Sequence, residues 1–169
     1  SLLDIEQPVI ARLPGHAIGL GCTLALFCDI IYATKMTKIG DPHVSVGLVA
    51  GDGGAVIWPQ LIGYPRAKEY LMTGDLLSAD HASDIGLINY AVSDDQLDDV
   101  VYGMAERLAG GATNAIKWTK SSINIGLKQV ANSVLDAAFN FEAMSQMTED
   151  HKIATEAFLA KEKPKFTGR

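Results

Sequence analysis

Two of the four histidines in this 169-residue chain stand beside glycine-rich turns, where a side chain can reach a cleft. These are His16 and His43, whereas His81 and His151 fall in polar helical segments and are expected at the surface. Histidine has a reference pKa of about 6.5 and can exchange a proton near neutral pH. His16 and His43 are therefore candidate acid–base residues, with a purely structural role as the alternative for each.

A second candidate feature is the stretch Pro14 to Asp29, PGHAIGLGCTLALFCD. Its glycines are Gly15, Gly19 and Gly21. An apolar, β-rich run precedes it and residues 22–28 have helical spacing, so we predict a strand, a tight loop and a buried helix. The first N–H groups of a helix lack intrahelical acceptors and suit a developing negative charge. Backbone turning and close packing explain the glycines equally well.

Several catalytic and binding motifs are absent. The chain has no GxSxG, no GxxxxGK[ST] and no HExxH. Gly19-Leu20-Gly21 approaches a dinucleotide fingerprint, but Leu24 stands where the third glycine belongs. The sequence therefore gives no support to a serine hydrolase of the α/β-hydrolase type, a P-loop, a zinc protease helix or a dinucleotide site.

In the first half of the chain, the elements that must position these residues are strands that alternate with helices. We predict strands at 8–13, 29–34, 37–40 and 87–92, and helices at 22–28, 53–62, 66–73 and 79–85. Strands separated by buried helices indicate an α/β core, here assigned to residues 1–93. Because a core strand starts after only seven residues, we expect that an N-terminal part of this core is absent from the chain.

From residue 94 onward the pattern is almost wholly helical. We predict helices at 95–108, 112–125, 130–147 and 149–160. The third has a wide apolar stripe that includes Val130, Val134 and Ala138. This region, 94–169, can pack on the core or on another subunit, and the sequence alone leaves both open.

Net charge, cysteine content and hydrophobicity limit the partners and the cellular location that we expect. The formal net charge of -6 argues against broad binding to nucleic acid or to an anionic membrane. Cys22 and Cys28 lie in an apolar helical run and favour a reducing compartment, which we expect to be the cytoplasm. No apolar run approaches the roughly 20 residues of a membrane span, and the first residues lack the basic start of a signal peptide.

Four ordered blocks of the sequence resemble the crotonase superfamily, the enoyl-CoA hydratase/isomerase family. They are PVIARLPGHAIGLGCTLALFCDIIYAT, IGDPHVSVGLVAGDGGAVIWPQLIG, RAKEYLMTGDLLSADHASDIGLINYAV and AFLAKEKPKFTGR. The resemblance spans essentially the whole chain. It implies an α/β fold in which a crotonase-like spiral of ββα units, partial here over 1–93, precedes a C-terminal helical trimerisation region over 94–169.

The resemblance also implies the partners. Family members form homotrimers, often paired into hexamers, and act on acyl-CoA substrates without a metal or redox cofactor. Members are about half as long again as this chain. The implied missing part would carry one of the two oxyanion-hole amides and much of the CoA site.

Roles for particular positions follow from the same resemblance. The backbone N–H of Leu20 matches one half of the oxyanion hole. The implied substrate-binding residues are Gly19, Gly21, Gly51, Phe158 and Lys161. Phe158 and Lys161 match positions that reach the CoA of a neighbouring subunit, although a solvated basic tail is the alternative explanation for the lysine.

The chain departs from the family hydratases at the two catalytic glutamates, which are replaced by Thr23 and His43. Threonine can hydrogen-bond a water molecule but is no base near neutral pH, whereas His43 can act as acid or base. Asp52 follows nine residues later and is its candidate partner or a second acid–base group. Capping of the next helix is the alternative role for Asp52, and the two roles are compatible.

Three functions remain. The first is an acyl-CoA enzyme of the hydratase/isomerase type that stabilises an enolate in a backbone oxyanion hole. The second is a C–C bond hydrolase or decarboxylase that uses His43 and Asp52. The third is a non-catalytic family member that kept the fold and lost the acids.

Overall fold

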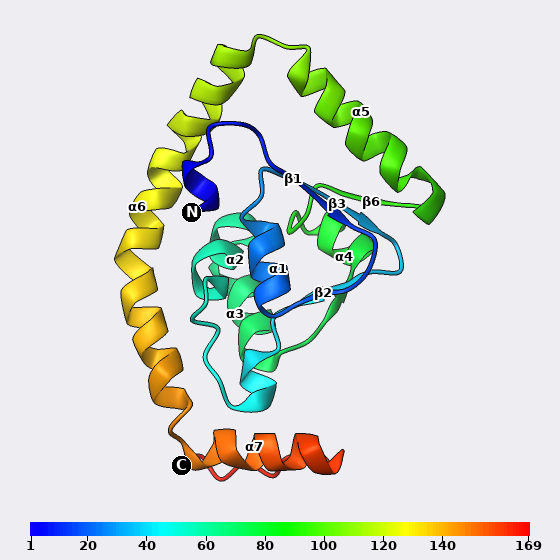
Figure 1. Cartoon of the computed structure of the whole chain (residues 1–169). Coiled ribbons are helices and arrows are strands. Elements are labelled where there is room, and N and C mark those ends of the chain that lie inside the picture. Colours follow the sequence, from blue (N-terminus) through cyan, green and yellow to red (C-terminus); the bar gives the residue numbers. More distant parts are fainter.

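The computed structural model describes residues 1–169 and contains two small three-stranded sheets (Figure 1). The first sheet is parallel, in the order β1 (Ile10–Leu13), β3 (Ile30–Thr34), β6 (Tyr90–Val92). The second has the order β2 (Ala17–Ile18), β4 (Lys38–Gly40), β5 (Leu77–Ser78), with β2 and β4 parallel and β5 antiparallel to β4.

The chain visits the two sheets in turn. It runs from β1 to β2, through helix α1 (Leu20–Leu26), and then returns to β3 and β4. Each of these two passes gives one strand to each sheet before a helix follows, which is a ββα unit, whereas α4 separates the last strands, β5 and β6. The predicted α/β class is confirmed, and so are the strands in 8–13, 29–34, 37–40 and 87–92. The two-residue strands β2 and β5 were not predicted because they are too short to show an alternating pattern.

Helices cover these strands and bury the main apolar core. They are α1, α2 (Gly54–Ile62), α3 (Tyr64–Thr73) and α4 (Ala79–Asp84). Trp58 of α2 is fully buried, as are Ile39 of β4 and Leu87, which follows α4. Burial of each such side chain stabilises the fold by about 1.5 to 3 kcal/mol. Three short 3-10 turns complete this part: η1 (Leu2–Asp4), η2 (His43–Val46) and η3 (Asp94–Gln96).

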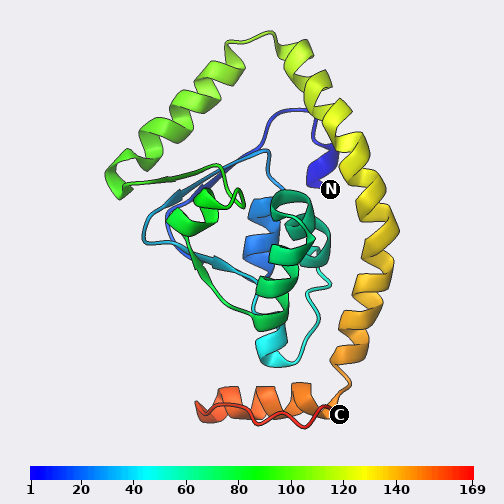
Figure 2. The same cartoon turned by 180° about the vertical axis from the view of Figure 1, so that it is seen from behind.

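Three helices form an outer frame around the core. They are α5 (Leu97–Ala109), α6 (Thr113–Ser145) and α7 (Glu149–Ala160). In Figures 1 and 2, α6 runs along the side of the core, while α5 and α7 lie at its two ends. None of the helices has the length and apolarity that crossing a membrane requires.

The separate helices predicted at 112–125 and 130–147 are wrong, because α6 is one helix of 33 residues. The only breaker between them is Gly126, and a single glycine costs a helix about 1 kcal/mol relative to alanine. The surrounding Leu127, Lys128 and Gln129 are good helix formers.

Small residues of α6 face the core. Ala131 and Ala138 are buried, and Val130 and Val134 of the predicted stripe are half-buried. Many large apolar side chains of α6 are exposed instead: Trp118, Ile123, Ile125, Phe139, Phe141 and Met144. The helix therefore presents apolar surface both to the core and away from it.

Candidate active site

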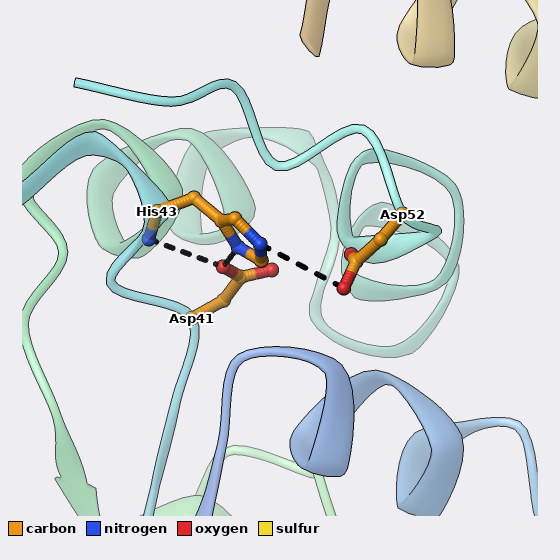
Figure 3. A group of neighbouring side chains, drawn as sticks. All are labelled: Asp41, His43 and Asp52. Atoms are coloured by element: carbon orange, nitrogen blue, oxygen red, sulfur yellow. Dashed lines mark hydrogen bonds and ion pairs between the residues drawn. The ribbon is translucent and has the colours of Figure 1, made fainter. Parts of the chain in front are cut away.

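His43 is held by a buried carboxylate two residues before it. The side chain of Asp41, which directly follows β4, has no exposed surface, and its Oδ1 pairs with His43 Nδ1 (Figure 3). The same oxygen accepts the backbone N–H of His43 at 3.4 Å. Asp41 thereby fixes the ring, so that Nε2 is left for other partners. This contact was not predicted from the sequence.

The surroundings of His43 favour its protonated form. The hydrogen bond to Asp41 raises the pKa of His43 above its ordinary value, burial works in the opposite direction, and the charges of Asp41, Asp52 and Glu142 raise it further. The side chain is 15% exposed. The side chain of His43 is thus mostly buried but still reaches the surface, and its surroundings raise its pKa.

The two oxygens of Asp52 have different surroundings. Oδ1 accepts the Thr23 hydroxyl at 3.1 Å and the Gly54 backbone N–H at 3.4 Å, at the start of α2. Oδ2 lies 3.8 Å from His43 Nε2 and is buried without any hydrogen-bond donor in the chain (Figure 3). One oxygen therefore anchors the loop to the helix start, and the other faces the histidine.

The structure brings Thr23 into this group through α1. Thr23 is 2% exposed, and its hydroxyl donates to Asp52. In this arrangement the proton of the hydroxyl orients the carboxylate instead of reaching a ligand.

The loop before α1 lies beside His43. Gly19 has φ 59° and ψ -130°, a conformation that residues with a side chain rarely adopt. An ideal Cβ built on Gly19 would lie 3.8 Å from His43 Cε1, and the Gly19 N–H donates to Gly40 O at 3.0 Å. The start of α1, with Leu20 as its first residue, is therefore fastened next to Asp41 and His43.

A further carboxylate, Glu142, comes from α6 and was not predicted. An ideal Cβ on Gly51 would lie only 2.8 Å from both Cβ and Oε2 of Glu142, and it would also collide with the Ala138 carbonyl. Residue 51 therefore cannot carry a side chain in this packing. Glu142 Oε2 is buried and has no donor within the chain. The loop gains a second anchor where the Val49 N–H donates to Ser145 Oγ at 3.1 Å.

A cavity of about 450 Å³ reaches this group from one side, with Asp52 in its wall. Its apolar lining comes from α1 and α6: Leu24, Phe27, Ala131, Leu135 and Phe139. Residues of η1 close another side. The volume is in the range of small-ligand sites, and the lining suits an apolar group. Gly21 lies outside this cavity and lines a separate, shallow depression with Leu13 and Leu24.

Phe158 and Lys161 lie at the C-terminal end of α7. Phe158 is on α7 and is 74% exposed, and Lys161 ends α7 in a left-handed conformation with φ 57°. The tail beyond them folds back on the start of α7, where Asp150 accepts the Thr167 and Gly168 backbone N–H groups. Their predicted role at the CoA of a neighbouring subunit stays a prediction.

The remaining histidines have ordinary structural partners. His16 Nδ1 accepts the Lys38 N–H at 3.0 Å, and His81 Nε2 pairs with the Tyr70 hydroxyl at 2.9 Å. His151 Nδ1 lies 2.7 Å from the Val46 carbonyl and donates to it. These contacts favour the structural alternative for His16.

Asp41, His43 and Asp52 each offer one potential ligand atom within 4.8 Å of the others. The Nδ1 of His43 is already paired with Asp41, however, which leaves a histidine nitrogen facing one carboxylate oxygen. The acid–base roles of His43 and Asp52 stay predictions. The expectation that the protein uses no metal or redox cofactor stays a prediction.

Comparison with known proteins gives consistent matches along the chain. The enoyl-CoA hydratase/isomerase family model matches residues 1–169. A crotonyl-CoA hydratase from Syntrophomonas wolfei is 36% identical over 169 residues, covering 98% of this chain and 64% of the relative. A short-chain-enoyl-CoA hydratase from Clostridioides difficile is 36% identical over 147 residues, covering 87% of this chain and 94% of the relative.

Solved structures share the fold. An enoyl-CoA hydratase from Mycobacterium avium subsp. paratuberculosis matches with a TM-score of 0.91 at 25% identity, covering 98% of this chain and 68% of that one. An enoyl-CoA hydratase/isomerase from Pseudoalteromonas atlantica gives a TM-score of 0.88 at 28% identity, covering 98% and 67%. The chain spans under two thirds of the Syntrophomonas wolfei relative, while its matched residues include the whole group around His43. The chain therefore belongs to the enoyl-CoA hydratase/isomerase family of the crotonase superfamily.

Proposed function

We propose that the protein is an enzyme that converts acyl-CoA thioesters through an enolate, with His43 as the acid–base residue. One observation carries this proposal: His43, oriented by buried Asp41, lies between the start of α1 and the Asp52 carboxylate. Family membership supports the CoA thioester as the substrate class.

The start of α1 would supply the electrostatic part of catalysis. When a proton leaves the α-carbon or a nucleophile adds to the β-carbon, negative charge develops on the thioester oxygen. The Leu20 N–H is the first of α1 and has no acceptor within the helix. One such donor in an oxyanion hole stabilises the transition state by about 3 to 4 kcal/mol.

His43 would supply the proton transfer. With Nδ1–H held by Asp41, the lone pair of Nε2 is free to take a proton from water or from a C–H group. The imidazolium that forms would face Asp52 Oδ2 at 3.8 Å, an opposite charge at close range. In family hydratases two glutamates do this work, so we propose that the chemistry here moved to a histidine in place of the second glutamate.

The same geometry favours a second candidate, hydrolysis of a C–C bond in a β-dicarbonyl compound. A histidine flanked by carboxylates can deprotonate water for attack on a carbonyl carbon. Cleavage would then leave an enolate on the oxygen that the Leu20 N–H can reach. A decarboxylation would use the same enolate.

We also propose that the protein assembles as a homotrimer or hexamer. The support is the set of exposed large apolar side chains on α6 and at Phe158 and Leu159 of α7, which a second copy of this chain can cover. Cys22 and Cys28 are both free, which fits the reducing conditions of the cytoplasm.

The first experiment is to mix the full-length natural polypeptide with short- and long-chain 2-enoyl-CoAs and follow the enoyl-thioester absorbance. Loss of absorbance with formation of 3-hydroxyacyl-CoA in the wild type, and not in His43→Gln, supports a histidine-based hydratase. If the absorbance persists, β-dicarbonyl thioesters are incubated with the wild type and with His43→Gln, and the cleavage products are measured. If His43→Gln converts these substrates as fast as the wild type does, the proposed mechanism is contradicted.

A further inference from the structure

Three buried carboxylate oxygens in the group around His43 lack any donor in the chain: Asp41 Oδ2, Asp52 Oδ2 and Glu142 Oε2. Asp41 Oδ2 packs against Gly54, whereas Asp52 follows Gly51 in the loop and Glu142 lies against Gly51. Buried polar atoms are nearly always hydrogen-bonded, and an ionised carboxylate can only accept. Two such atoms beside one loop, in a site that borders a cavity, call for a donor that the protein itself does not provide.

The neighbouring groups of the chain are already engaged. The Thr23 hydroxyl and the Gly54 N–H both donate to the other oxygen of Asp52. Lys128, the cation in the cavity wall, pairs with Asp4 at 2.8 Å. Glu142 itself lies against Gly51, and its Oε2 has no hydrogen-bond partner in the chain.

We propose that Glu142 is a further catalytic residue, which together with Asp52 holds the water molecule that His43 deprotonates. This inference rests on the proposed function and adds how the attacking water molecule of that reaction is bound. Water has two O–H groups, which can donate to Asp52 Oδ2 and Glu142 Oε2. For the reaction, the O–H directed at Asp52 Oδ2 turns to His43 Nε2, which lies 3.8 Å from that oxygen, and the other O–H stays on Glu142.

The step balances as an addition of water. One O–H bond of the held water breaks, its proton passes to His43 Nε2, and its electron pair forms the new bond from oxygen to the electrophilic carbon. The electrons displaced from that carbon move to the thioester oxygen at the Leu20 N–H. The imidazolium then returns the proton to the α-carbon, while the second O–H proton remains on the added oxygen.

The charge environment is consistent with this role. The titratable groups that face His43 are Asp41 at the end of β4, Asp52 before α2 and Glu142 on α6. Cys22 of α1 also lies near, but burial raises the pKa of its thiol to about 12, so it stays neutral. Glu142 therefore helps to stabilise the imidazolium that forms when water loses its proton.

The test compares Glu142→Gln with Asp136→Asn in the full-length polypeptide. Both changes remove one negative charge from α6, but the Asp136 side chain is exposed. We expect Glu142→Gln to lower kcat about 100-fold or more, with a smaller change in KM. Because loss of the Glu142 charge lowers the pKa of His43, the acid limb of the pH–rate profile should move to lower pH. Asp136→Asn should change neither quantity.

Glutamine has the size of glutamate, so a purely structural role of Glu142 against Gly51 would survive the change. The histidine Cε1–H resonance of His43 gives a readout without substrate, and its titration midpoint should fall in Glu142→Gln only. Should the glutamine variant unfold, Glu142→Asp keeps the charge and is expected to retain the wild-type acid limb with a lower kcat.

An active wild type whose kcat and acid limb are unaffected by Glu142→Gln overturns this inference and leaves the proposed function standing. A wild type that converts neither enoyl-CoA nor β-dicarbonyl thioesters overturns the proposed function, and the water-holding role falls with it. The wild-type assay therefore separates the two failures.

Discussion

At the scale of single residues, the two nitrogens of His43 have different partners, and this difference defines the site. Nδ1 is paired with a carboxylate that has no exposed surface, whereas Nε2 faces Asp52 across 3.8 Å, too far for a direct hydrogen bond. A ring held in this way has one fixed tautomer and one free lone pair. That is the requirement for a general base whose direction of attack is set in advance.

Replacement of His43 by glutamine should remove the base while leaving a polar side chain of similar reach. Because general acid–base catalysis contributes about 10² to 10⁴ in rate, we expect kcat to fall by that factor. Steady-state kinetics on the best CoA thioester measure it. A variant with wild-type kcat would move the acid–base role away from residue 43.

Asp41→Asn should shift the pH dependence of the same reaction. The hydrogen bond that His43 Nδ1–H donates to Asp41 is the largest cause of the raised pKa of His43, so the variant lowers that pKa. The neutral ring is the active base, and therefore the midpoint of the acid limb of kcat/KM should move to lower pH. An unchanged midpoint would contradict the assigned role of Asp41.

The same pair should also make stability depend on pH. A histidine whose pKa is raised by folding stabilises the native state fully below its unfolded value of about 6.5, and this stabilisation disappears as pH rises through the folded pKa. The difference in unfolding free energy between wild type and Asp41→Asn should therefore be larger at acid than at alkaline pH. Urea unfolding at several pH values tests the sign.

At the scale of elements, the loop between η2 and α2 depends on its contact with α6. The Val49 N–H is bonded to Ser145, and Gly51 packs directly on Ala138 and Glu142. The next residue of the loop is Asp52. A helix of the outer frame thus sets the position of a carboxylate in the site.

Gly51→Ala should disturb this contact. The added methyl group would meet the Ala138 carbonyl and Glu142, so we expect a loss of about 1 to 3 kcal/mol in unfolding free energy and lower activity. Gly126→Ala is the control. Gly126 belongs to α6, and a Cβ added there would meet nothing within 4 Å. That change should stabilise by about 0.5 to 1 kcal/mol. Chemical denaturation measures both, and equal effects would contradict the close approach at residue 51.

Local sequence patterns were sufficient for most of the elements. The strand at 29–34 and the helix at 53–62 were predicted because apolar runs and flanking glycines carry enough local signal. The strands β2 and β5 have two residues each, so no period exists to detect. The continuity of α6 was missed because Gly126 resembles a breaker when its tertiary surroundings are unknown.

The site was only partly predictable. His43, Asp52 and Thr23 were proposed from their places in glycine-rich and helical segments that resemble a family. Asp41 was not predicted, because nothing in a single sequence tells whether an aspartate before proline points into the core. Glu142 stands 90 positions beyond Asp52, and only the packing of α6 on Gly51 brings the two near one another.

At the scale of the whole molecule, lysines of α6 form ion pairs and a hydrogen bond with the first residues of the chain. Lys117 pairs with Glu6 at 2.6 Å, and Lys128 pairs with Asp4. Lys120 is buried, bonded to the Gln7 carbonyl and to Asp29. The N-terminal segment, the strand β3 that follows Asp29, and α6 therefore meet at one group of charges.

Lys120→Met should break this junction and leave Asp29 without its cation. Removing one partner of a buried pair is strongly destabilising, and because Asp29 is 24% exposed we expect a loss of about 2 to 3 kcal/mol. Lys152→Met is the control, since its pair with Glu156 is exposed and should matter by less than about 0.5 kcal/mol. Thermal unfolding compares the two variants, and similar values would contradict the assigned role of Lys120.

Because α6 is a single continuous helix, it fixes the directions in which its side chains point about the helix axis relative to one another. Its 33 residues span about 50 Å at 1.5 Å per residue, and each residue turns the helix by about 100°. Lys120 near one end and Glu142 near the other are therefore locked in both spacing and direction. One residue inserted or deleted between them would turn Glu142 by more than a quarter of a circle, so the number of residues between these two side chains is itself part of the site.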